Sequence, residues 1–255
     1  MRKNLYQDLF ELEEKHWWHL SKRKVLLEII KDLNLNKFRN PKILEIGCGT
    51  GKNLEVLDKF GKTLGLDISE EAIKFCRKRG LKNVSLGQAE KIPFPKDNFD
   101  LVVLLDVLEH TNDQKTIKEI HRILKSKGFL IVTAPAFPWL WSQWDVVLGH
   151  KRRYTLKGLA FILKREGFET KKISYMFSFL VVPAFFVRLI KSKFFKKDYR
   201  SDFRLSILFL NWIFLQFSNL ERLILLKKGI PFGTSIICLA QKRQVNRTNR
   251  KNYPR

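Results

Sequence analysis

The segment "KILEIGCGTG", residues 42–51, decides the fold of this chain. It joins a short apolar run, typical of a buried strand, to three glycines within five positions. Glycine lets the backbone turn sharply and approach a ligand closely, because it lacks a Cβ atom. The segment therefore predicts a strand, a tight turn and a helix, with a ligand at the turn. A dinucleotide, a nucleotide triphosphate and a molecule without phosphate are the three ligand classes to compare.

Two phosphate-binding patterns fit the turn poorly. The triphosphate loop G-x-x-x-x-G-K-[ST] requires glycine where this chain has Ile46, and a hydroxyl residue where it has Asn53. The dinucleotide pattern G-x-G-x-x-G requires glycine at the position of Lys52. Neither pattern is complete, so the turn does not favour a phosphate ligand.

Acidic residues accompany the turn instead. Glu45 precedes the glycines in the pattern acidic-x-G-x-G-x-G, and Asp67 ends the next strand-like run, "TLGLD". A carboxylate at the tip of each strand suits a ligand that carries a protonated amine and a ribose diol, because carboxylates accept hydrogen bonds from both groups. The motif therefore indicates a ligand with amine and ribose parts.

The composition permits one large domain with a full core. The chain has 255 residues, of which 45% are apolar, and this excludes a mostly disordered protein. The three cysteines lack the spacing of a zinc site or a disulfide framework, and the N-terminal segment lacks signal-peptide features. We therefore expect a reducing, cytoplasmic location. The net charge of +24 indicates an anionic partner: nucleic acid, a membrane surface or an anionic substrate.

Strand and helix patterns alternate from residue 38 to residue 175. The predicted strands are "KILEIG", "TLGLD", "VSLGQ", "FDLVVLLD" and "GFLIVTAP". Caps and terminal glycines predict three helices, from Ser69 to Gly80, from Asn112 or Asp113 to Gly128, and from Thr155 to Gly167. This alternation predicts an α/β fold, with a mostly parallel sheet covered by helices on both faces.

Composition changes divide the chain into five segments. We expect an N-terminal helical cap (1–37), the core (38–175), a basic and apolar helical insertion (176–229), a final core strand (230–242) and a disordered basic tail (243–255). The apolar runs of the insertion are shorter than the roughly 20 residues that span a membrane. They are expected to form helices that lie on a surface. Neighbouring lysines and arginines suit an anionic membrane, while burial within the protein or against a dimer partner is the alternative.

Residues 42–51 resemble the first motif of the class I S-adenosylmethionine-dependent methyltransferases. "GQAEKIPFPKDNFDLVVLLDVLEH", residues 87–110, is similar to the corresponding stretch of their ubiquinone-biosynthesis-like branch, methyltransferase type 11. The resemblance implies a Rossmann-like, doubly wound sheet of seven strands, with the hydrophobic helical insertion before the last strand. It also implies S-adenosylmethionine, a sulfonium cation without phosphate, as the cofactor.

The resemblance implies which residues hold this cofactor. The glycine turn passes under the methionine part, Glu45 reaches its amine, and Asp67 takes both ribose hydroxyls. Gln88 departs from the aspartate that the family places at the adenine, yet its carbonyl oxygen can still accept from the exocyclic amine. On the N-terminal segment, Trp18 and Arg23 cover the methionine part, with helix packing as the alternative for the tryptophan. The full predicted set is Glu45, Gly47, Cys48, Gly49, Gly51, Asp67, Ile68, Gln88, Ala89, Leu105, Trp18 and Arg23.

Methyl transfer requires an aligned acceptor and, for a hydroxyl or amine, a base. "DVLEH" supplies Asp106 and His110, and the long loop "PAFPWLWSQWDVVLGHKRRYT", residues 135–155, supplies His150. We take His110, His150 and Asp106 as catalytic candidates, with capping or packing as the alternative for His110. "DVLEH" is similar to a metal motif of some quinone O-methyltransferases. The same letters occur in many relatives without metal, so no metal is predicted.

The acceptor is suggested by three further matches. "WW", "GHKRRYT" and "PFGTS" resemble a branch of the family that accompanies glycosyltransferases of surface-polysaccharide assembly. This implies O-methylation of a glycan, a lipid-linked intermediate or another small molecule, on the inner membrane face, with residues 176–229 on an anionic surface. An RNA methyltransferase is the less favoured alternative, because the chain lacks an RNA-binding module and the N/D-P-P-Y/F signature. A non-catalytic, membrane-associated adaptor is the other alternative.

Overall fold

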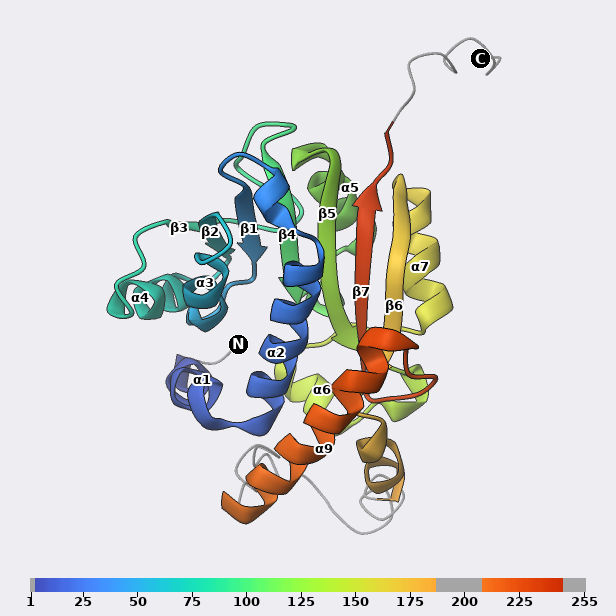
Figure 1. The fold of residues 1–255 in the computed structure, drawn as a ribbon. Helices are drawn as coiled ribbons and strands as arrows, with labels where there is room; N and C mark the ends of the chain where they lie inside the picture. Colours follow the sequence, from blue (N-terminus) through green and yellow to red (C-terminus); the bar gives the residue numbers. More distant parts are fainter. Residues whose placement is uncertain (1–2, 187–207, 245–255) are drawn as a thin grey trace.

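Seven strands form one sheet in the part of the chain that the computed structural model describes, residues 3–186 and 208–244 (Figure 1). Their order is β3-β2-β1-β4-β5-β7-β6. Strands β1 to β5 pair in parallel, and β7 runs antiparallel between β5 and β6. The predicted α/β sheet of seven mostly parallel strands is confirmed. The strands are β1 (Lys42–Ile46), β2 (Lys62–Asp67), β3 (Val84–Leu86), β4 (Phe99–Leu105), β5 (Leu124–Pro135), β6 (Phe168–Met176) and β7 (Ser235–Lys242).

Helices precede the first strand and fill most connections. Ser69, Asn112 and Thr155 each accept a hydrogen bond from the backbone N–H three residues later, as predicted for helix caps. Gly80 and Gly167 follow two of these helices with φ of +83° and +87°. The helices are α1 (Lys3–Lys15), α2 (Trp17–Asp32), α3 (Lys52–Leu57), α4 (Glu70–Lys78), α5 (Asp113–Ile123), α6 (Gln143–Leu148), α7 (Leu156–Arg165) and α9 (Leu208–Lys227), with the 3-10 turns η1 (Leu35–Lys37), η2 (Leu108–His110), η3 (Pro138–Leu140) and η4 (Ser178–Leu180).

The helix predicted to end at Gly128 is wrong at its C-terminal end. Helix α5 ends at Ile123, and β5 begins at Leu124 and pairs with β4. Gly128 lies inside β5, where a Cβ atom would be 2.9 Å from the carbonyl oxygen of Lys125 and 3.3 Å from that of Asp100. Glycine is therefore needed for a close approach of two backbones. The polar run before it hid the strand from pattern analysis.

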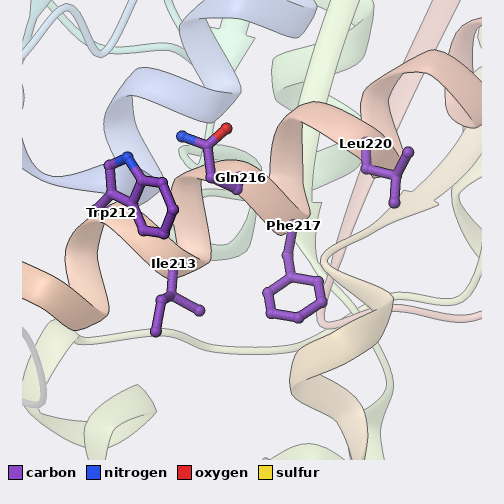
Figure 2. A pocket seen from close by; sticks show the side chains of 5 residues that line it. All are labelled: Trp212, Ile213, Gln216, Phe217 and Leu220. Atoms are coloured by element: carbon purple, nitrogen blue, oxygen red, sulfur yellow. The ribbon is translucent and has the colours of Figure 1, made fainter.

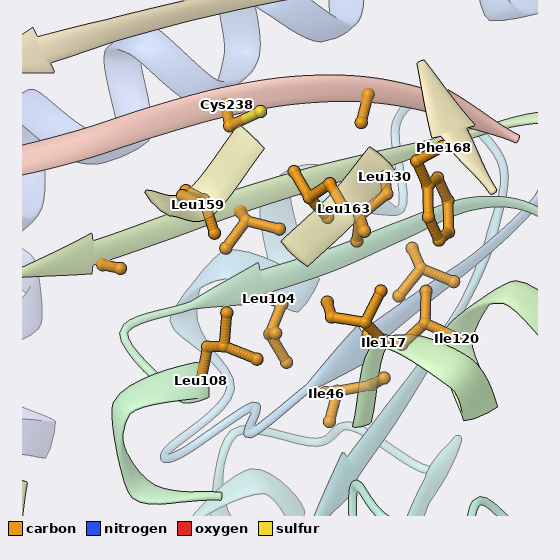
Figure 3. Close-up of a cluster of buried hydrophobic side chains, with 14 of the residues drawn as sticks. Ile46, Leu104, Leu108, Ile117, Ile120, Leu130, Leu159, Leu163, Phe168 and Cys238 are labelled. Atoms are coloured by element: carbon orange, nitrogen blue, oxygen red, sulfur yellow. The ribbon is translucent and has the colours of Figure 1, made fainter. Parts of the chain in front are cut away.

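Alternate residues of the central strands pack on opposite faces of the sheet. One face meets α5 and α7, and Figure 3 shows part of this cluster. Its members include Leu44, Ile46, Val102, Leu104, Ile117, Ile120, Leu159 and Leu163. The other face meets α2 and α9 through residues that include Leu26, Ile29, Ile43, Leu101, Val103, Ile131 and Leu225. Burial on both faces explains why the strands are apolar at nearly every position.

Helix α9 packs against α2 (Figure 1). The ring of Trp17 lies 5.3 Å from that of Phe214 and 5.3 Å from that of Phe177, between ring centroids. One side of the predicted surface helix is thus buried against the N-terminal helices. Residues 187–207, which carry much of the predicted basic insertion, and the tail from residue 245 lie outside the described residues. Among the helices of the described ranges, none has the length and apolar character to cross a membrane.

Candidate active site

The order of the strands reverses between β1 and β4, which lie side by side. In open α/β sheets, ligands bind beyond the carboxyl ends of the strands at such a point, because the flanking connections part there. The glycine turn follows β1, and Asp106 follows β4. The topology therefore brings the glycine turn and Asp106 to one edge of the sheet.

The glycine turn has the backbone conformation that its composition predicts. Gly47, Gly49 and Gly51 have φ of +69°, +55° and +88°. The amide of Gly47 donates to the carbonyl oxygen of Leu66 at 2.7 Å, which ties the turn to β2. A Cβ atom on Gly47 would lie 2.2 Å from a methyl carbon of Val107. This position needs glycine both for its dihedral angle and for space.

Asp67 holds the turn from the end of β2. Its carboxylate accepts from the amide of Gly49 at 2.9 Å and from the amide of Ser69 at 2.9 Å. Burial raises the pKa of Asp67, while these backbone donors act in the opposite direction. Each carboxylate oxygen keeps a further lone pair, so the side chain can order the turn and also accept two ribose hydroxyls. The neighbouring Ile68 is 68% exposed and offers an apolar surface beside this position.

Glu45 is buried at the end of β1. Its Oε1 atom accepts from the side-chain amide of Asn53 at 2.9 Å, and its Oε2 atom has no hydrogen-bond partner within the described ranges. Burial raises the pKa of Glu45 to about 8. Arg23 donates to Asn53 at 3.2 Å and to the carbonyl oxygen of Glu13 at 2.9 Å. Arg23 is thus linked to Glu45 through Asn53. In the sequence, Asn53 was noted only because it does not match the triphosphate-loop pattern.

The remaining predicted cofactor residues lie in the turn, just after β3, at the end of β4 or on α2. Cys48 is buried within the turn, and its sulfur lies 3.9 Å from that of Cys76. Ala89 is buried, Gln88 beside it is exposed, and Leu105 is half-buried at the end of β4. Trp18 stands on α2 with the ammonium group of Lys22 3.8 Å from its ring centroid. The structure therefore places aromatic and basic groups of the N-terminal segment beside β4.

Helix α1 lies against the glycine turn. The hydroxyl of Thr50, inside the turn, donates to the carboxylate of Glu13. Arg79, just after α4, donates to Glu14 at 2.7 Å, to the carbonyl oxygen of Phe10 at 3.1 Å and to that of Thr50 at 2.9 Å. One arginine thus fastens the N-terminal cap to the turn. This contact was not predictable from the sequence, because Arg79 resembles an ordinary basic residue at a helix end.

Asp106 is engaged in an ion pair. Its backbone has φ of +53°, and its carboxylate pairs with Lys22 of α2. The hydroxyl of Thr133 also donates to it at 3.1 Å. The pair joins the N-terminal helix to the end of β4, and Lys22 gave no signal in the sequence. The negative charge of Asp106, one of the three catalytic candidates, is therefore balanced by Lys22.

His110 and His150 lie next to each other, with ring centroids 4.9 Å apart. The Nδ1 atom of His150 is 2.8 Å from a carboxylate oxygen of Asp145, and that of His110 is 3.2 Å from the carbonyl oxygen of Gly149. Both partners are acceptors, so we assign the proton to Nδ1 and a free lone pair to Nε2 in each ring. Burial lowers the pKa of His110, and His150 lowers it further.

Glu109 is fully buried beside the two histidines. Neither of its carboxylate oxygens has a hydrogen-bond partner among the described residues, and Oε1 lies 3.9 Å from Nε2 of His150. Burial raises the pKa of Glu109 well above its ordinary value. Asp145 is buried too, but hydrogen bonds from His150 and Arg153 outweigh its burial and lower its pKa. Two buried carboxyl groups thus differ in their electrostatic surroundings.

The tryptophan-rich loop after β5 folds into η3 and α6. Ser142 and Asp145 form a capping box at the start of α6, and Arg153 donates to Asp145 at 2.8 Å. Trp139 and Trp141 remain 55% and 40% exposed. The loop therefore positions His150 through Asp145 and leaves aromatic surface outside.

Comparisons with known proteins agree with this geometry. Residues 44–132 match the family described as a methyltransferase domain. A demethylmenaquinone methyltransferase from Geobacillus stearothermophilus is 34% identical over 135 residues, which cover 49% of this chain and 56% of that enzyme. The uncharacterised protein MJ1252 of Methanocaldococcus jannaschii is 30% identical over 167 residues, which cover 64% of this chain and 60% of that protein. A solved S-adenosylmethionine-dependent methyltransferase from Archaeoglobus fulgidus has a TM-score of 0.56 at 21% identity, covering 86% of this chain and 94% of that one.

The sheet order and the glycine turn with its two carboxylates define a Rossmann-like methyltransferase fold. Together with the family match, they confirm the resemblance found in the sequence. Within residues 44–132 the chain carries a methyltransferase domain of the class I S-adenosylmethionine-dependent type. It spans less than two thirds of the length of either curated relative, at 60% and 56%. The polysaccharide-associated branch stays a prediction.

Proposed function

We propose that this protein transfers the methyl group of S-adenosylmethionine to a hydroxyl oxygen of a glycan, lipid-linked or other small-molecule acceptor. One observation carries the proposal. The glycine turn held by Asp67 and the histidine pair beside Glu109 lie beyond neighbouring strands at the same edge of the sheet. The glycine turn suits the methyl donor S-adenosylmethionine, and the histidine pair suits an acceptor that must lose a proton.

The reaction needs alignment and proton removal. The acceptor oxygen attacks the methyl carbon, the carbon–sulfur bond breaks, and its electron pair returns to sulfur. The products are a methyl ether and S-adenosylhomocysteine. No covalent nucleophile is required, so positioning supplies much of the rate. The hydroxyl proton leaves toward the cluster of Glu109, His110 and His150, where basic groups gather.

A calorimetric titration with S-adenosylmethionine tests the donor half of this proposal. We expect saturable binding by the wild type, and a large loss of affinity in Asp67→Ala. A transfer assay with labelled cofactor against lipid-linked glycan, quinone and RNA extracts tests the acceptor half. Label in the glycan or another small-molecule fraction supports the proposal, and label in RNA alone overturns the acceptor class. Absence of cofactor binding favours the non-catalytic adaptor.

Helix α9 supports an acceptor at a membrane surface. Several large apolar side chains on it are about half exposed or more: Phe209, Trp212, Phe217, Leu220, Leu223 and Ile224. Figure 2 shows part of this row, where Trp212, Ile213, Gln216, Phe217 and Leu220 line an apolar depression of about 300 Å³. Together with the net charge of +24, such a helix suits in-plane contact with an anionic leaflet.

Flotation with anionic vesicles tests this location. The double variant Trp212→Asp, Phe217→Asp should lose vesicle binding, because charges replace the apolar contacts. Phe161→Asp is the matched control, since Phe161 is 60% exposed but lies on α7. Equal flotation of the double variant and the wild type would remove the membrane from the proposal and leave the transfer reaction in place.

A further inference from the structure

We propose that Glu109, His110 and His150 bind a first-row divalent transition metal ion, such as Zn²⁺ or Mn²⁺. Glu109 and His110 come from η2 after β4, and His150 comes from the loop after α6. One ligand atom from each residue lies within 4.8 Å of the others. The inference rests on the proposed function and deepens it, because the ion would hold the acceptor hydroxyl. It goes beyond the sequence, from which no metal was predicted.

The distances fit an ion better than a direct hydrogen bond. Oε1 of Glu109 and Nε2 of His150 are 3.9 Å apart. This exceeds hydrogen-bond distance. Two ligand atoms at metal bond lengths of about 2.0–2.2 Å are separated by no more than about 4.4 Å, so an ion fits between them. The three ligand atoms lie within 4.8 Å of one another, so binding of an ion would draw them together by up to about 1.5 Å.

The local charges leave Glu109 without a partner. It is fully buried, and its two oxygens accept no hydrogen bond from the described part of the chain. The nearby cations are engaged elsewhere, Lys22 with Asp106 and Arg153 with Asp145. A buried, unpaired carboxylate is strongly unfavourable, so this group requires a proton or a further cation. A divalent ion supplies that charge.

Hydrogen bonds at Nδ1 orient both histidines as possible ligands. Asp145 accepts from Nδ1 of His150, and the carbonyl oxygen of Gly149 accepts from Nδ1 of His110. Metal-binding histidines are commonly oriented in this way, because the partner fixes the tautomer and leaves the other nitrogen free to ligate. Arg153 in turn holds Asp145 at 2.8 Å. The arrangement therefore extends from the ligands to the residues that orient them.

The tertiary structure selects a ligand set that the sequence motif does not. In "DVLEH", Asp106 stands in the acidic position, yet Lys22 occupies its carboxylate. His150 of the distant loop takes its place beside Glu109. Two imidazoles and one carboxylate favour first-row transition metals over Mg²⁺ or Ca²⁺, which prefer oxygen ligands. Three protein ligands leave positions open, where an acceptor hydroxyl can bind and lose its proton more easily.

Metal titration of the protein, first stripped with a chelator, tests the site directly. We expect one equivalent of Zn²⁺ to bind, and Co²⁺ to give visible absorption bands typical of nitrogen and oxygen ligands. Glu109→Gln and His110→Gln should each weaken binding by about 100-fold or more, because each replaces a carboxylate or imidazole ligand by a neutral amide. His121→Gln is the matched control, since this histidine packs on Phe168 away from the cluster. Circular dichroism establishes that each variant is folded.

The outcomes separate this inference from the proposed function. Absence of stoichiometric binding, or equal binding by the wild type and folded Glu109→Gln and His110→Gln variants, overturns the metal site. If S-adenosylmethionine still binds in that case, the transfer reaction stands without a metal. If the metal binds but S-adenosylmethionine does not, the proposed transfer reaction fails. Loss of metal in the two ligand variants, with retention in His121→Gln, supports the site.

Discussion

Asp67→Ala should weaken S-adenosylmethionine binding by at least about 100-fold. In the wild type the carboxylate accepts two amide hydrogen bonds, each 2.9 Å long, and these hold Gly49 and Ser69. In the complex it would also accept two ribose hydroxyls. Hydrogen bonds to a charged group contribute about 1.5–3 kcal/mol each, so two lost bonds amount to about 3–6 kcal/mol. Every 1.4 kcal/mol is about a tenfold change in affinity, and the lower bound exceeds two such steps.

Isothermal titration calorimetry at neutral pH measures this loss. Asp58→Ala is the matched control, because it removes an exposed carboxylate at the end of α3, away from the turn. The control should bind as the wild type does. Far-ultraviolet circular dichroism should show that Asp67→Ala is folded, although its melting temperature falls because the turn loses two hydrogen bonds. A dissociation constant within threefold of the wild type, in a folded variant, would refute the assigned role.

Three further substitutions, two of them with a matched control substitution, test the geometry. Gly47→Ala should destabilise the protein in urea unfolding by about 2–4 kcal/mol, because its φ is +69° and a new Cβ atom would meet a valine methyl at 2.2 Å. Gly80→Ala, at +83° in open space, should cost only about 1 kcal/mol. Arg79→Ala should increase proteolysis within α1 by about tenfold, because the cap loses its anchor. Arg77→Ala, exposed on α4, should leave the rate unchanged. Glu45→Gln should make stability less dependent on pH between 5.5 and 7.5, by up to about 2.7 kcal/mol.

The sign of the last effect follows from the raised pKa of Glu45, about 8 against an ordinary 4.5. The folded state binds the Glu45 proton more tightly than the unfolded state does. The resulting stabilisation of the folded state is fully present below pH 4.5 and is lost as pH rises through 8. Glu45→Gln lacks this pH-dependent loss, so its stability increases relative to that of the wild type as pH rises. Parallel pH curves for the two proteins would contradict the burial argument. Equal losses in the free energy of unfolding for Gly47→Ala and Gly80→Ala would contradict the steric argument for Gly47. An unchanged cleavage rate in Arg79→Ala would contradict the anchoring of α1.

The sheet, the turn and most caps were predictable because their signals are local. Ser69 and Thr155 cap the helices as expected, since a cap depends on a few neighbouring residues. Gly128 misled the prediction, because the same residue serves a helix end or a close strand approach. Its role depends on the backbone of Asp100, which the linear pattern does not reveal.

The residues of the candidate site also fall into two groups, those with a local signal in the sequence and those that matter through a distant partner. Gly47, Gly49 and Asp67 were recognisable, since their spacing follows from one strand–turn–helix unit and the next strand. Lys22 and Asn53 were missed as site residues. Each matters through a partner on another element, Asp106 for the lysine and Glu45 for the asparagine. Such pairings depend on where the helices lie.

The sequence by itself determined the fold class and the residues of the glycine turn, because hydrophobic periodicity and glycine conformation act over short stretches of chain. The tertiary structure alone decided which polar groups meet at the edge of the sheet. It paired Asp106 with Lys22 and placed His150 beside Glu109 and His110. The physical reason is that buried charges are balanced by neighbours in space. Parallel strands and long connections bring those neighbours from distant parts of the chain.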